Sequence, residues 1–344
     1  MAKKEKLDYP ALLKQLKAEG PGQLYLLWGE EDFLRESFVS ELRKLCLGES
    51  DDGFDYKRID GAEPDIGLIR EAADAMPFFA PRLYIELRGF DINKYPANDA
   101  EQLKAILADL PEFCTMVILL PAGSEPDGRL GLFKAVKKYG QSIEFTAQDQ
   151  DQLVRWIRRK VRAAGKDIDP VEAQYLIFNC GELMSHLNNE LSKLVHYSKG
   201  EQITRSDIDA ATDRSMEAEV FQLTDALADR KYDRAASVMA ELLAKKESPI
   251  MLLAVMGRQF RQLYITKTAL SLHLGQSYIK EVCALRFDFQ LQKLTDAARG
   301  FTLPRLRDAV RLCAETDYAM KSSGADDEAL LRDLLLKLAV GGAA

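Results

Sequence analysis

A junction at Gly29 has the layout of a phosphate-binding site. Residues 24–28 (LYLLW) predict a buried strand, Gly29 ends it, and an amphipathic helical pattern follows at once. In nucleotide-binding proteins such a junction carries glycines whose neighbouring N–H groups bind phosphate, followed by a lysine and a hydroxyl that reaches Mg²⁺. The chemistry to test for at this place is therefore phosphoryl transfer.

The residue types at this junction do not suit phosphate. Counted from Gly29, the second glycine, the lysine and the hydroxyl of a phosphate loop fall on Leu34, Arg35 and Glu36. Residues 30–32 (EED) add three carboxylates that suit the positive end of a helix dipole but repel a polyphosphate. We expect no nucleotide cofactor here and no ATP hydrolysis. A nucleotide-dependent enzyme with an atypical phosphate loop is the alternative.

A second unusual segment is residues 76–82 (MPFFAPR), where two adjacent phenylalanines stand between two prolines. A helix over 65–75 should stop before Pro77, because the residue before a proline disfavours the helical region. Neighbouring side chains of an extended segment point to opposite sides, so Phe78 and Phe79 cannot easily enter one core. At least one of them should be exposed or seek a partner. The alternative is a hydrophobic connector packed under the sheet.

Basic residues gather on a third segment, Arg155, Arg158, Arg159 and Arg162. They lie in a helical pattern over 150–164 whose apolar stripe faces a core, so the solvated face of an amphipathic helix explains them. Contact with DNA phosphates is the alternative. The chain contains no motif that indicates a catalytic residue or a metal ligand, and its three histidines are isolated in the sequence.

Composition indicates an ordinary globular protein. The chain has 344 residues, 47% hydrophobic and 29% charged, with a net charge of −7, which argues against a polycation. No apolar run approaches the roughly 20 residues that span a bilayer, and the start of the chain has no apolar signal stretch. The five cysteines are scattered and read as core residues in a reducing compartment. We therefore expect a cytoplasmic location and no membrane partner.

The element pattern predicts an α/β part followed by all-α parts. Strands are expected at 24–28, 56–59, 83–87, 116–120 and 142–145, separated by helical patterns, and this alternation predicts a parallel sheet. After residue 147 the strand signal ends and only helical patterns follow. We expect three domains, at 1–146, 147–212 and 213–344.

The order of these parts and five short motifs resemble the bacterial DNA polymerase III delta-subunit family, the clamp-loader subunits with a degenerate AAA+ module. The motifs are YLLWGEE at 25–31, NNELSKL at 188–194, VFQLTDAL at 220–227, RQFRQL at 258–263 and KSSG at 321–324. The resemblance implies an AAA+-like domain with a five-stranded parallel sheet, a small helical lid domain and a C-terminal helical collar domain. It also implies a non-catalytic subunit, classed with DNA-directed DNA polymerase only through the holoenzyme.

The resemblance further implies partners and sites. The partners would be the ring-shaped sliding clamp (beta), the delta-prime and tau or gamma subunits, and primed DNA within the complex. The clamp-binding tip of that family falls on Met76, Phe78 and Phe79. A degenerate AAA+ scaffold of another assembly, such as a delta-prime-like subunit, is the remaining alternative.

Overall fold

A computed structural model describes residues 8–48, 53–285 and 288–340. The chain divides into two compact units, Met1–Gln152 (unit 1) and Leu153–Ala344 (unit 2). The predicted boundary at 212/213 falls inside unit 2, so the division into three domains stays a prediction.

Unit 1 is built on a five-stranded parallel sheet with the order β2-β3-β4-β1-β5. The strands are β1 (Leu24–Gly29), β2 (Tyr56–Asp60), β3 (Leu83–Arg88), β4 (Cys114–Leu119) and β5 (Gln141–Phe145). Each pair is in parallel register, for example Leu26 with Ile118 and Leu26 with Ser142. The expected strands and the parallel sheet are confirmed.

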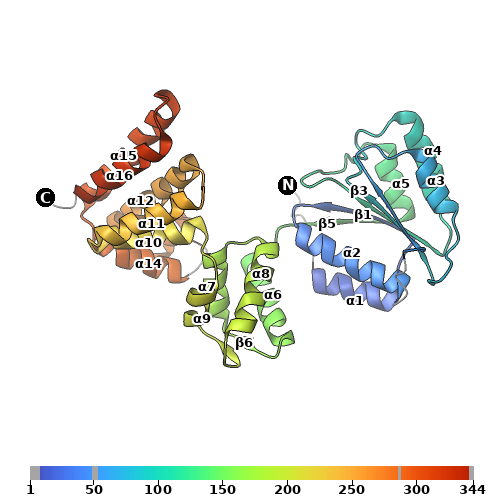
Figure 1. Cartoon of the computed structure of the whole chain (residues 1–344), viewed down its shortest axis with the longest axis horizontal. Coiled ribbons are helices and arrows are strands. Elements are labelled where there is room, and N and C mark those ends of the chain that lie inside the picture. Colours follow the sequence, from blue (N-terminus) through green and yellow to red (C-terminus); the bar gives the residue numbers. More distant parts are fainter. Residues whose placement is uncertain (1–7, 49–52, 286–287, 341–344) are drawn as a thin grey trace. The chain divides into compact units, whose positions relative to one another are not determined.

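Helices cover both faces of this sheet (Figure 1). They are α1 (Tyr9–Glu19), α2 (Asp32–Leu47), α3 (Ile66–Asp74), α4 (Ala97–Ala108) and α5 (Gly131–Tyr139). Because strand side chains alternate, Tyr25 packs on Phe38 of α2 while Leu24 and Leu26 join the core under α3, α4 and α5. This double burial explains why β1 reads as a continuous apolar run.

Unit 2 is mostly helical. Its first elements are α6 (Gln150–Ala163), α7 (Pro170–Cys180), α8 (Met184–Tyr197) and α9 (Arg205–Ala211). Two short strands, β6 (Asp167–Ile168) and β7 (Gln202–Ile203), pair in parallel among these helices. The expectation that only helices follow residue 147 is therefore wrong, because two-residue strands are too short to leave a periodic signal.

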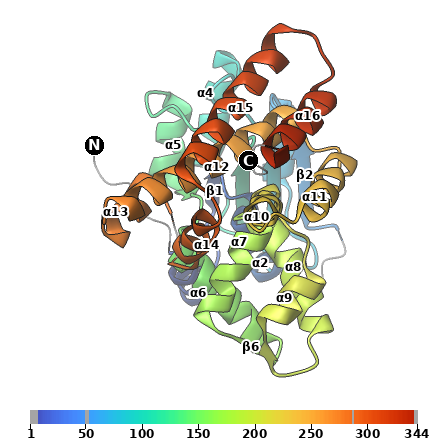
Figure 2. The ribbon, with the colours of Figure 1, turned by 90° about the vertical axis from the view of Figure 1, so that its left-hand side faces the viewer.

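Helix α12 contacts α10, α13, α14, α15 and α16 of the remaining helices of unit 2, and α11 packs on α10 and α16 (Figure 2). They are α10 (Met216–Ala228), α11 (Tyr232–Ala244), α12 (Pro249–Ser271), α13 (Gln276–Val282), α14 (Asp288–Arg299), α15 (Leu303–Ser322) and α16 (Asp327–Val340). The parallel sheet with helices on both faces, followed by helical parts, confirms the expected AAA+-like architecture with a C-terminal helical region.

All five cysteines are buried and none forms a disulfide, as expected for core residues. Within the ranges that the structure describes, no helix is long and apolar enough to cross a bilayer.

Candidate functional site

Gly29 is required by the close approach of strand β5. Its φ is +121°, and a Cβ at this position would lie 2.3 Å from the carbonyl oxygen of Phe145. The same oxygen accepts a hydrogen bond from the backbone N–H of Glu31, 2.9 Å away. A backbone N–H that could face a phosphate is thus already bonded inside the protein.

The side chains at the junction are also bonded to one another. The Arg35 guanidinium is buried; its Nη2 lies 2.6 Å from Asp32 and its Nη1 donates to the carbonyl oxygen of Leu120. Two hydrogen bonds of 2.8 Å join Arg88 to Glu36 and hold the pKa of that carboxyl below its usual value. A negative charge therefore stands where a phosphate loop has its hydroxyl.

The loop from the end of α3 to β3 carries three exposed apolar side chains. Met76, Phe78 and Phe79 are 79%, 77% and 54% exposed. Helix α3 ends at Asp74, before Pro77 as expected. The connector packed under the sheet is therefore the wrong alternative, and both phenylalanines lie at the surface, in agreement with the expectation that at least one is exposed.

The two phenylalanine rings lie on the same side of this loop. Their centroids are 4.6 Å apart with an edge-to-face geometry, so the expectation that they point to opposite sides is wrong. Phe54, before β2, is 64% exposed and its ring packs edge-to-face on Phe79 with centroids 5.7 Å apart. We call Phe54, Met76, Phe78 and Phe79 the aromatic tip.

A buried carboxylate holds the loop in this conformation. Asp55 is only 2% exposed and accepts hydrogen bonds from the backbone N–H groups of Phe78, Phe79 and Ala80, at 2.5, 2.7 and 2.6 Å. Three converging bonds bend the chain here, which is why the rings do not alternate as in an extended segment.

Sequence reasoning did not find Phe54 and Asp55. They follow a turn-rich connector at 48–53 and lie more than 20 residues before the loop that they contact. The available signal was a phenylalanine beside a turn, followed by an aspartate directly before an edge strand. Only the pairing of β2 with β3 brings that signal to the tip.

The predicted basic residues lie on α6. Arg155, Arg159 and Arg162 are exposed, while Arg158 is half-buried and donates to the carbonyl oxygen of Ile168 at 3.2 Å. Arg162 forms an ion pair of 3.1 Å with Asp167. The apolar stripe of the helix is buried as expected. Arg155 and Arg159, one turn apart, are the pair that presents charge to solvent.

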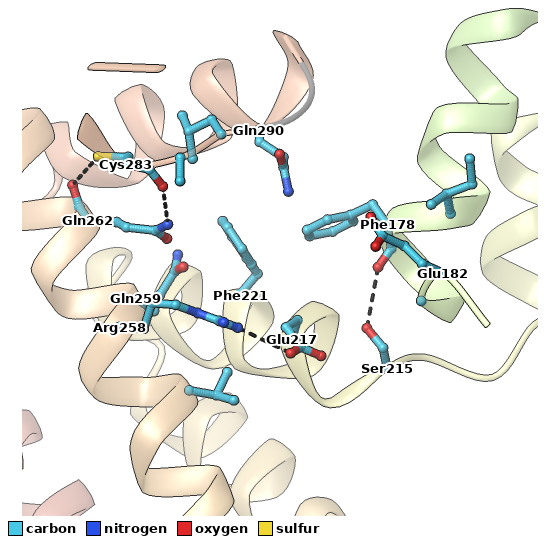
Figure 3. A pocket seen from close by; sticks show the side chains of 15 residues that line it. Phe178, Glu182, Ser215, Glu217, Phe221, Arg258, Gln259, Gln262, Cys283 and Gln290 are labelled. Carbon is cyan, nitrogen blue, oxygen red and sulfur yellow. Dashed lines mark hydrogen bonds and ion pairs between the residues drawn. The ribbon is translucent and has the colours of Figure 1, made fainter. Parts of the chain in front are cut away.

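Unit 2 contains a cavity of about 510 Å³ lined by α7, α10 and α12 among others (Figure 3). Phe178 and Phe221 face it with ring centroids 5.1 Å apart. Its one lining cation among the described residues, Arg258, is paired with Glu217 at 3.1 Å. The described residues that line the cavity therefore offer a polyphosphate no uncompensated positive charge, and we do not assign a nucleotide to it.

Family models match both ends of the chain. A model described as DNA polymerase III, delta subunit, matches residues 25–148, and one described as DNA polymerase III delta subunit, C-terminal domain, matches residues 217–338. The chain belongs to the DNA polymerase III delta subunit family. The first delta match includes both the Gly29 junction and the loop with Phe78 and Phe79, whereas the basic residues of α6 lie between the two matches.

Relatives with this name are similar over nearly the whole chain. DNA polymerase III subunit delta of Bacillus subtilis is 25% identical over 332 residues, covering 94% of this chain and 95% of that one. The Escherichia coli subunit is 22% identical over 323 residues, with 91% and 90% covered.

A solved structure supports the fold. The Bacillus subtilis DNA clamp loader delta protein has a TM-score of 0.55 and 24% identity, covering 96% of this chain and 99% of that one. This match supports a shared fold over the covered part of the chain.

Proposed function

We propose that this chain binds the ring-shaped sliding clamp and holds it open while primed DNA enters, without hydrolysing ATP itself. The observation that carries the proposal is the aromatic tip, an exposed apolar surface held firmly at the sheet edge in a chain of the delta family. Adjacent exposed phenylalanines have a solvation cost, so a partner pocket that buries them would bind favourably.

The mechanism follows from differential affinity. A ligand shifts an equilibrium only if it binds one state better than the other. If the tip fits the clamp better when one clamp interface is open, its binding energy stabilises the open ring. ATP binding in neighbouring subunits would then control when the tip reaches the clamp.

The Gly29 junction supports the part of the proposal that concerns ATP. Its backbone is packed against Phe145, Arg35 is buried in an ion pair with Asp32, and Glu36 is ionised. A triphosphate would meet carboxylates instead of a lysine and a hydroxyl. This arrangement disfavours the alternative of an enzyme with an atypical phosphate loop.

Two calorimetric titrations of the purified chain test the proposed function. Titration with the cognate sliding clamp should give saturable heat, and titration with MgATP should give none. Clamp affinity should also be the same with and without MgATP. A micromolar dissociation constant for MgATP, roughly 8 kcal/mol of binding, would contradict the second expectation. A chain that ignores the clamp yet assembles with other proteins would favour the scaffold alternative.

We propose that the helices after residue 213 form the collar that joins the delta-prime and tau or gamma subunits. Exposed apolar side chains on α12, α15 and α16 support this, for example Met251, Tyr318 and Leu336. Co-elution with those subunits in size-exclusion chromatography is the expected result, and a chain that stays alone would overturn the assignment.

We also propose that Arg155 and Arg159 contact DNA phosphates in the assembled loader. Each phosphate contact contributes about 0.9 to the slope of log affinity against log salt concentration for duplex DNA. Replacing both with Gln should therefore lower that slope by about 2 and weaken DNA binding at low salt. Arg332→Gln on α16, also an exposed cation, is the matched control and should leave the slope unchanged. An unaltered slope in the double variant would contradict the DNA contact and would mean that these arginines belong only to the solvated face of α6.

A further inference from the structure

Asp55 occupies an unusual place beside the aromatic tip. It is a nearly fully buried carboxylate, and it directly precedes β2 at the edge of the sheet. No side-chain ion pair to Asp55 is seen among the described residues; its oxygens accept instead from three consecutive backbone N–H groups. Hydrogen bonds to an ionised acceptor are short and strong, so this contact fixes the backbone of residues 78–80.

The consequence for the tip is conformational. Residues 75–82 form neither helix nor strand, and an unanchored loop of this length would sample many conformations. Asp55 links residues 78–80 of this loop to the edge pair of strands, since its own carbonyl oxygen also accepts from the backbone N–H of Tyr84 in β3 at 2.8 Å. The end of the loop is held separately, because the Arg82 guanidinium donates to Thr115 and Cys114 of β4.

We propose that Asp55 is a positioning residue that holds Phe78 and Phe79 in the conformation in which they bind the clamp. The inference rests on the proposed function and adds a residue to it. A preorganised loop binds more tightly than a mobile one because less conformational entropy is lost on binding. Asp55 touches no partner itself and acts only through the backbone of the loop.

The charge of Asp55 is consistent with this role. Burial acts to raise its pKa, but the three backbone hydrogen bonds outweigh burial, and the pKa lies below the usual value for aspartate. A carboxyl with a lowered pKa stabilises the folded loop above its ordinary pKa of about 3.9 and loses this contribution as the pH falls through the lowered value. The anchor is therefore complete throughout the neutral range.

Asp55→Asn is the decisive variant, because the side chain keeps its shape while an NH₂ group replaces one acceptor and faces an N–H donor. We expect clamp affinity to fall about 10- to 100-fold and amide hydrogen exchange of Phe78, Phe79 and Ala80 to accelerate. Asp60→Asn, an exposed aspartate at the other end of β2, is the matched control and should change neither.

A double-mutant cycle separates positioning from general damage. In a Phe78→Ala background, Asp55→Asn should cost much less clamp affinity than in the wild type, because there is less to position. Equal losses in both backgrounds, or a folded Asp55→Asn chain with normal clamp affinity, would overturn the inference. If Asp55→Asn does not fold, Asp55→Ser, which removes the carboxylate without adding an amide donor, takes its place.

Clamp binding by the wild-type chain tests the proposed function separately from the inference on Asp55. A wild-type chain that does not bind the clamp defeats the proposed function, whereas wild-type binding that Asp55→Asn leaves intact defeats only the inference on Asp55.

Discussion

A chain with both Phe78→Ala and Phe79→Ala should lose nearly all clamp binding and unfold like the wild type. Both rings are more than half exposed, so their removal opens no cavity in the core. Burying one phenylalanine against a partner contributes on the order of 1.5–3 kcal/mol. Losing two such anchors at the centre of an interface should weaken binding by roughly 3–6 kcal/mol, about two to four decades in affinity.

Thermal unfolding and clamp affinity should be measured on the same samples. Tyr318→Ala in unit 2 removes another exposed aromatic side chain and should leave clamp affinity unchanged. A double variant that melts early would mean that the rings support the fold, and normal binding by a folded double variant would defeat the clamp-binding assignment.

Much of the fold could be predicted because short apolar runs and turn residues, which are local features of the sequence, mark the strands. The five strands of unit 1 are short apolar runs between turn residues, and the structure places all of them within two residues of the expected bounds. Helix α1, before the first strand, was not expected, and only Tyr9 and Leu16 of its residues are buried.

The tip could be predicted only in part. The doubled phenylalanine between two prolines indicated exposure, which is observed, although the alternation of side chains on which that prediction rested is not. What fixes the loop could not be predicted, because Asp55 acts across the pairing of β2 with β3 and nothing local marks an aspartate as a backbone acceptor. Contacts that depend on which strands become neighbours are visible only once the sheet is known.

The same limit applies to Gly29. Its place between a strand and a helix is that of the first glycine of a phosphate loop, whereas its environment shows a glycine required by packing. A methyl group there would meet backbone atoms of Phe145 at 2.3–2.8 Å, and Phe145 is itself fully buried and lies opposite Gly29 in the register of β5 with β1. The backbone conformation, with φ at +121°, is also one that side chains rarely adopt.

Gly29→Ala should therefore destabilise unit 1 severely. Backbone strain of this kind costs about 1–3 kcal/mol and overpacking typically another 1–3, so we expect a loss of roughly 2–6 kcal/mol in the free energy of unfolding. That is a large part of the roughly 5–15 kcal/mol that stabilises a typical protein. Urea unfolding followed by the fluorescence of Trp28, beside the site, is the measurement, in a Trp156→Phe background that removes the second tryptophan.

Gly61→Ala is the matched control for this prediction. Its φ of +134° imposes a similar backbone strain, but nothing lies within 4 Å of the added Cβ. The difference between the two variants, about 1–3 kcal/mol, then measures the contact with Phe145 alone. Equal free energies of unfolding for the two variants would mean that β5 can shift to accommodate the methyl group, so that packing does not explain why Gly29 is a glycine. A larger loss at Gly29 would mean that the close approach of β5 to β1, and not a bound phosphate, requires the glycine.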